Sequence, residues 1–135
     1  MMKDLETIAF VEAERLQPFK WGKNDCNTFV LKYLDKVWGR DLLKEAYGKY
    51  DNKQDAVIFQ SEYPNMISDA IIETGAVKIP PGLAKMGDIL VVDFKLFELC
   101  HLCLGSKVAS VPEDGMTQVS RIEDFVVFDW ALRIN

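Results

Sequence analysis

The 135-residue sequence predicts an α+β fold, in which N-terminal helices pack on a C-terminal antiparallel β-sheet. Apolar residues recur at helical spacing in the first half, whereas the second half carries short β-rich runs separated by turns that contain glycine. Hydrophobic residues make up 49% of the chain, and we find no repeat or low-complexity linker that would divide it. We therefore expect residues 1–135 to form a single domain.

The first half of the chain predicts the helices. Residues 3–16 place Leu5, Ile8 and Leu16 on one apolar face, and in an amphipathic helix that face is directed toward the core. Further helices are expected at residues 25–38, at 41–48 and, on either side of Pro64, within 54–74.

The second half predicts the strands. Residues 89–94, which follow Gly87 and the turn residue Asp88, form an apolar run too continuous for an exposed strand, so this strand should be central. We expect the other strands at residues 77–79, 99–104, 107–111, 116–120, 125–128 and 130–134.

The charge balance excludes several classes of partner. The formal net charge is −5, whereas nucleic acids and anionic membranes are bound by basic patches, so we expect neither partner. No apolar run approaches the roughly 20 residues that a membrane helix needs. The N-terminus is acidic and amphipathic, which does not predict a signal peptide.

Cys26 lies where an extended segment is expected to become a helix. Pro18 and Gly22 break the chain before it, and Asn24 or Asp25 can cap the new helix with a side-chain oxygen. A thiol in the first helical turn lies where the helix dipole and free N–H groups favour an anion, which predicts a lowered thiol pKa. Cys26 is therefore the candidate nucleophile, and its own N–H is the candidate oxyanion donor.

His101 is the only histidine of the sequence, so any mechanism that needs an imidazole must use it. We expect it on a strand that faces Cys26, because cysteine hydrolases hold an imidazole within hydrogen-bond reach of the thiolate. Ser110 on the neighbouring strand is a candidate to orient the ring, and Trp21 and Tyr33 are candidates to line a cleft. The alternative is purely structural: a small buried cysteine, a satisfied strand histidine, a surface hydroxyl and core aromatic rings.

The segment Cys100-His101-Leu102-Cys103 raises a metal alternative. Side chains alternate along a strand, so His101 and Cys103 share a face and could join Cys26 as three ligands of a zinc ion. A zinc knuckle normally carries its cysteine pair on a turn with Gly or Pro and has a second ligand pair elsewhere, and this sequence has neither. We therefore expect no metal and no cofactor, and we interpret Cys100 and Cys103 as core thiols.

The motif Trp21-Gly22-x-x-Asp25-Cys26-x-x-Phe29-Val30 resembles the nucleophile motif of NlpC-type papain-like cysteine peptidases. Residues 87–90, Gly-Asp-Ile-Leu, resemble the strand start of that family, and residues 101–105, His-Leu-Cys-Leu-Gly, look like its histidine strand. Residues 18–26 and 130–134 are similar to a compact branch found among phage tail genes. The resemblance covers the chain from about residue 10 to residue 134.

This resemblance implies a papain-like core and cleavage of peptidoglycan stem peptides, with Cys26 as nucleophile, His101 as base and the third polar residue near Ser110. It predicts a virion protein of the phage tail that acts as a cell-wall cysteine peptidase or amidase and contacts other tail proteins, with Asp25 and Cys26 in the positioning and oxyanion roles. Counted back from Gly105, however, the family's histidine falls at residue 99, which is a leucine. The alternative function is therefore a catalytically inactive tail-tip assembly module of the same fold.

Overall fold

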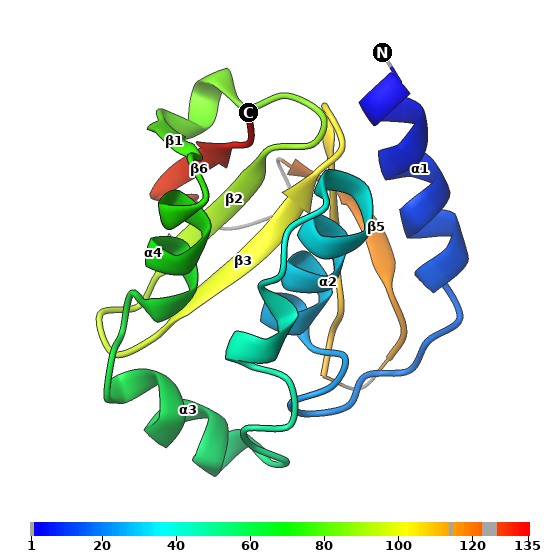
Figure 1. Ribbon diagram of the computed structural model, residues 1–135. Coiled ribbons are helices and arrows are strands. Elements are labelled where there is room, and N and C mark those ends of the chain that lie inside the picture. The colour runs from blue at the N-terminus through cyan, green and yellow to red at the C-terminus, as the bar shows by residue number, and fades with distance from the viewer. Residues whose placement is uncertain (1, 114, 123–126) are drawn as a thin grey trace.

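The computed structural model describes residues 2–113, 115–122 and 127–135, and over these residues the fold is α+β, as predicted (Figure 1). The α-helices are α1 (Met2–Glu14), α2 (Cys26–Trp38), α3 (Lys53–Ser61) and α4 (Met66–Glu73). Short 3-10 helices lie at Leu43–Glu45 and Pro81–Leu83. The strands are β1 (Val77–Ile79), β2 (Ile89–Asp93), β3 (Glu98–Cys103), β4 (Lys107–Ser110), β5 (Gln118–Arg121) and β6 (Trp130–Arg133).

The described strands form one six-stranded sheet in the order β1-β6-β2-β3-β4-β5, and every neighbouring pair is antiparallel. Strand β2 lies inside this sheet and its first four residues are buried, which confirms the prediction from its continuous apolar run. Its register with β3 sets Val92 opposite Leu99 and Leu90 opposite His101. Directly opposed residues of an antiparallel pair point to the same face, so this register decides which side of the sheet each side chain occupies.

Each face of the sheet carries its own apolar cluster. The larger cluster joins α1, α2 and α4 to the sheet through side chains such as Phe10, Phe29 and Leu102. The smaller cluster consists of residues on the other face: Leu90, Val92, Cys103, Val108, Phe128 and Ala131. Figure 1 shows α2 lying across β3 on the helical side, so α2 and the smaller cluster are on opposite sides of the sheet.

The buried face of α1 differs from the one that the periodicity predicted. Leu5 and Ile8 are 65% and 46% exposed, whereas Phe10 is buried and its ring packs 5.3 Å from Phe29 and 5.5 Å from Tyr33. The helix carries two apolar stripes, and the stripe with the aromatic ring buries more area against α2. Periodicity alone does not say which of two stripes faces the core.

Three further boundaries differ from expectation. Strand β5 begins at Gln118 rather than at residue 116, because Met116 bridges to Pro18 and the carbonyl of Gly115 accepts from the Phe19 N–H at 2.8 Å. The helix expected at 41–48 is a single 3-10 turn at Leu43–Glu45. Of the strand expected at 125–128, residues 125 and 126 lie outside the described residues, and residues 127 and 128 are not in a strand.

Candidate functional site

Helix α2 begins at Cys26, as predicted, and Asp25 is its N-cap. The Asp25 Oδ1 accepts from the Thr28 N–H at 2.9 Å, and the Thr28 hydroxyl accepts from the Asp25 N–H at 2.8 Å, which completes a capping box. The Asp25 Oδ2 accepts from the Gly22 N–H at 2.9 Å and from the Tyr50 hydroxyl at 2.7 Å. Asp25 therefore positions Cys26 through four local hydrogen bonds, with both carboxylate oxygens occupied.

Gly22 explains why the segment before Cys26 keeps its shape. Its φ is +77°, and a Cβ at this residue would lie 1.9 Å from the Tyr50 carbonyl oxygen, so only glycine fits. The Gly48 N–H donates to the Gly22 carbonyl at 2.9 Å and fixes the same contact from the other side. The residues of the Trp-Gly-x-x-Asp-Cys motif thus form a structural device that holds the start of α2 in place.

Asn27 fastens the start of α2 to strand β3. Its side-chain Nδ2 donates to the Glu98 carbonyl at 3.0 Å, and its Oδ1 accepts from the Cys100 N–H at 2.8 Å. These two backbone groups flank Leu99. The first turn of α2 is therefore anchored beside residue 99 of the strand, rather than farther along it.

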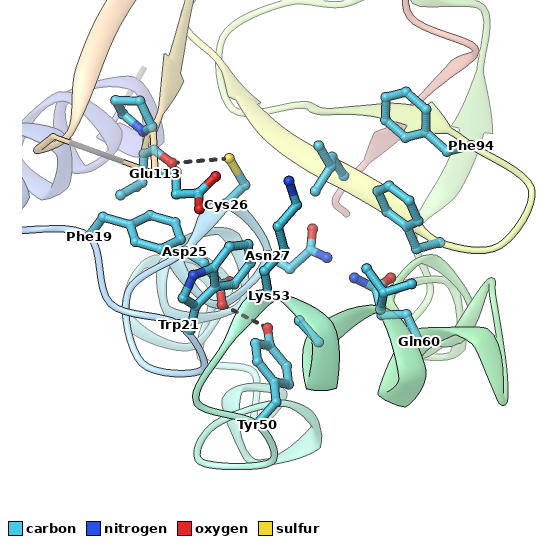
Figure 2. Close-up of a pocket in the computed structure, with 16 residues that line it drawn as sticks. Phe19, Trp21, Asp25, Cys26, Asn27, Tyr50, Lys53, Gln60, Phe94 and Glu113 are labelled. Atoms are coloured by element: carbon cyan, nitrogen blue, oxygen red, sulfur yellow. Dashed lines mark hydrogen bonds between the residues drawn. The ribbon is translucent and has the colours of Figure 1, made fainter.

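Cys26 lies in a pocket of about 390 Å³ (Figure 2). Most of its wall is apolar, and the rings that line it belong to Phe19, Trp21, Tyr50, Phe94 and Phe97. Trp21, the candidate to line a cleft, is one of these lining residues. The partly exposed thiol points toward the Val111 carbonyl, with the sulfur 3.5 Å from that oxygen.

Tyr33 does not belong to this cleft, and its predicted role is wrong. Its side chain is fully buried on the inner face of α2, where the hydroxyl contacts Thr7 Oγ1 at 2.7 Å and accepts from the Trp38 indole at 3.0 Å. Tyr33 is seven residues beyond Cys26, about two helical turns or 10 Å along the axis. The helix therefore carries it away from the pocket and into the core.

His101 does not face Cys26, and this expectation is also wrong. It lies opposite Leu90 of the smaller cluster, and its ring meets Phe128 edge-on at 5.5 Å. Among the described residues that line the Cys26 pocket, strand β3 contributes Leu99 and not His101. The two residues between these positions move a side chain about 7 Å along a strand, so the anchor at residue 99 leaves the imidazole within the sheet.

The pKa values oppose the expected ion pair. Burial, with a smaller contribution from the neighbouring Asp25 carboxylate, raises the pKa of the Cys26 thiol to about 11. The helix dipole predicted the opposite, but desolvation of a thiolate among apolar groups outweighs it, and the Asp25 charge is closer. Burial lowers the pKa of His101 to about 4. At neutral pH both side chains are therefore uncharged.

Ser110 is buried at the end of β4, opposite Gln118 of β5, and does not line the pocket. Ser110 was predicted to orient the His101 ring beside Cys26, and it cannot do so because His101 does not line that pocket. The surface-hydroxyl alternative is wrong as well, because Ser110 is only 8% exposed. The zinc alternative meets the same difficulty, since Cys103 packs in the smaller cluster on the far side of the sheet. Within residues 2–113, 115–122 and 127–135, no three His, Cys, Asp or Glu side chains gather as metal ligands would.

Several of the residues that line the pocket were not identified from the sequence. Tyr50 donates to Asp25 from the segment between the helices expected at 41–48 and within 54–74, and Lys53 and Gln60 line the pocket from α3. No local pattern pointed to these three. Leu99 did carry a signal, because the count back from Gly105 placed the family's histidine at that residue.

Comparison with known proteins gives a family but no activity. No curated protein matches the chain. None of the helices in the described part of the chain has the length and apolar character required to cross a membrane. A family model described as a domain of unknown function, DUF6950, matches residues 3–128. Since this match covers most of the sequence, the chain belongs to the DUF6950 family.

Proposed function

We propose that this protein is a catalytically silent papain-like domain of the NlpC type, which acts as an assembly module of a phage tail. The motif around Cys26, the helix that it opens and the antiparallel sheet beside it support the papain-like part of the proposal. The observation that carries the functional part is that Leu99, and not His101, completes the Cys26 pocket. The tail setting rests on the resemblance of residues 18–26 and 130–134.

The pocket lacks what amide hydrolysis requires. With a pKa of about 11, roughly one Cys26 thiol in 10,000 is ionised at pH 7. A hydrolase also needs a group that takes the thiol proton and returns it to the leaving amine. The described residues that line the pocket include no imidazole. Of the two carboxylates there, Asp25 is committed to Gly22, Thr28 and Tyr50, and Glu113 makes no hydrogen bond with the thiol, whose acceptor is the Val111 carbonyl.

A binding role makes use of the same features. The pocket is preformed, since capping, the Gly22 contact and the Asn27 anchor fix its floor before any ligand arrives. Its rim includes Phe94, which is 47% exposed at the end of the β2–β3 hairpin. An aromatic pocket beside an exposed aromatic ring suits the anchoring side chain of a partner protein. Other tail proteins are the proposed partners.

The experiment compares the wild-type protein with Cys26→Ala on purified peptidoglycan sacculi, with turbidity and released amines as readouts. We expect the same negligible activity in both proteins, because the thiol is un-ionised at neutral pH and no imidazole lines its pocket. A loss of turbidity that depends on Cys26 would contradict the silent assignment and restore the peptidase. Mass spectrometry of purified virions tests the tail setting separately, and absence of the chain from particles would refute it.

The peptidase with a peptidoglycan stem peptide as substrate remains the second candidate function. One observation favours it: the candidate nucleophile is the first residue of α2 and opens onto a pocket. It would require His101 to leave a buried site where its ring packs on Phe128. The two candidates therefore differ in one measurable property, the dependence of hydrolysis on Cys26.

A further inference from the structure

We propose that the Cys26 pocket binds an apolar group that ends in a carboxylate, with Lys53 as its counter-charge. This inference rests on the proposed function, because it treats the pocket as a site that retains a ligand and does not cleave it. It adds the chemical class of that ligand. Three features of the pocket support this ligand class: its apolar walls, the charged side chains that line it and the absence of a described ion-pair partner for Lys53.

The walls accept an aliphatic or aromatic body. A volume of about 390 Å³ lies within the range of small-ligand sites. Phe19 and Trp21 meet edge-to-face at 4.8 Å, and Phe94 and Phe97 stack at 5.0 Å, so two ordered aromatic pairs line the pocket. Such walls exclude water from a bound apolar group, and its burial supplies most of the affinity.

The positive charge among the described residues that line the pocket comes from α3. Lys53 is the first residue of that helix, and Figure 2 shows its side chain reaching up into the pocket. Its ammonium group makes no ion pair or hydrogen bond with any residue that the structure describes. Asp25 does not serve as its partner, because both of its carboxylate oxygens accept hydrogen bonds from other groups. Lys53 is thus an exposed cation at the edge of an apolar pocket, and a ligand carboxylate would pair with it.

Gln60 supplies a second donor on the same wall. It lies seven residues after Lys53, two turns along α3, so both side chains project toward the pocket. Its Oε1 accepts from the Glu98 N–H at 3.2 Å, while its NH₂ group has no hydrogen bond to a described residue. A ligand carboxylate has two oxygens that accept hydrogen bonds, and α3 presents two donors to them, the Lys53 ammonium group and the Gln60 NH₂ group.

Glu113 stands on the pocket rim and opposes a simple anion. It is exposed, and Figure 2 shows its carboxylate on the Cys26 side of the pocket. A free acid would be repelled by this charge, whereas the N–H groups of a peptide that ends in an apolar residue could donate to it. Lys53 attracts the ligand carboxylate and Glu113 repels it. Substitutions at Lys53 and at Glu113 therefore test the proposal separately.

The experiment measures binding by calorimetry and by Trp21 fluorescence with three probes: decanoate, an acetylated tripeptide that ends in phenylalanine carboxylate, and the C-terminal amide of that tripeptide. We expect the carboxylate peptide to bind about two- to fivefold more tightly than its amide, the effect of one ion pair at an exposed lysine. Lys53→Gln should remove this difference, and Lys49→Gln, at an exposed lysine away from the pocket, should preserve it. Glu113→Gln should tighten decanoate binding.

A pair of neighbouring positions on α3 tests the site itself. Val57→Trp fills the pocket and should abolish binding, whereas Ile58→Trp changes a half-exposed residue that does not line it and should have no effect. The proposal is overturned if acid and amide bind equally, if no probe binds at millimolar concentration, or if the two tryptophan variants behave alike in a folded protein. Tighter binding of the peptide than of decanoate identifies a polypeptide C-terminus as the source, and the reverse identifies a free acid.

The same samples separate this proposal from the proposed function. Mass spectrometry of the recovered peptide reports cleavage, and its dependence on Cys26 would refute the silent assignment whatever the affinities are. A probe that remains intact while acid and amide bind equally would refute the ligand class and leave the silent assignment standing.

Discussion

Substitution of Leu99 by histidine should return a reactive thiolate to this pocket. Leu99 lines the pocket with Cys26, and the Asn27 side chain holds the backbone on either side of residue 99 to the start of α2. An imidazole at this position would lie where the wild-type protein has an alkyl group, and its positive charge would favour the thiolate. The substitution thus tests the register on which the silent assignment depends.

The size of the effect follows from the thiol pKa. A pKa of about 11 leaves a thiolate fraction near 10⁻⁴ at pH 7, and a cysteine–histidine pair with a pKa near 7 raises that fraction about 5,000-fold. The thiolate is less nucleophilic at the lower pKa, by about 40- to 100-fold over four units. The net expectation is an alkylation rate about 50 to 125 times that of the wild type at pH 7.

The assay is the rate of iodoacetamide labelling at pH 7, with the modified residue identified by peptide mass spectrometry. Cys100 and Cys103 are fully buried and should react slowly in every variant. Leu99→Asn is the matched control, because it introduces a polar side chain of similar size without an imidazole. The reasoning is refuted if Leu99→His accelerates labelling by less than about threefold, or if Leu99→Asn accelerates it equally.

Three further predictions concern stability. Gly22→Ala should lower the free energy of unfolding by about 3 kcal/mol or prevent folding, because its Cβ would overlap the Tyr50 carbonyl oxygen. Gly39→Ala, at positive φ with open space around it, should lower that free energy by only about 1 kcal/mol. Equal losses in urea titrations would contradict this prediction. Tyr50→Phe removes a hydrogen bond to the buried Asp25 carboxylate and should cost about 2 kcal/mol, and a neutral result in the same titrations would show that the bond does not hold the loop. His101 has a folded pKa of about 4, below the 6.5 of the unfolded chain, so the unfolded state binds the extra proton. The free energy of unfolding should therefore fall by up to about 3 kcal/mol as pH drops from 6.5 to 4. His101→Leu should remove this part of the acid dependence, and an unchanged curve of stability against pH would argue against a buried neutral imidazole.

Much of the fold could be predicted from local sequence signals. The start of α2 at Cys26, its Asp25 cap and its end at residue 38 each depend on residues within one or two helical turns. The central position of β2 followed from its continuous apolar run, since a strand covered on both faces needs apolar side chains on both. Signals of this kind act over a few residues, and they were confirmed.

The chemistry of the site could not be predicted in the same way, because long-range register decides it. Leu99 and His101 share a face of β3, opposite Val92 and Leu90. The residue beside Cys26 therefore depends on hydrogen bonds between Asn27 and a strand more than 70 positions away. A difference of two residues in a strand keeps the face but changes the neighbours. The count back from Gly105 was the one sequence feature that pointed to Leu99.

The pKa of Cys26 shows how a correct local inference can give a wrong chemical one. The residue does open a helix, and a dipole there does favour a thiolate. The apolar rings of the pocket come from distant segments, and the cap that starts the helix brings its own negative charge next to the sulfur. The environment assembled by the fold therefore outweighs the effect of the helix itself.

The most direct test of the account is an NMR titration of His101, whose ring gives a single set of imidazole signals because the sequence has one histidine. The account predicts a midpoint near pH 4, with no change when Cys26 is replaced by alanine, since the ring is buried on Phe128 and apart from the thiol. A midpoint above pH 7 that falls in Cys26→Ala would mean that imidazolium and thiolate form a pair, and it would contradict the central claim.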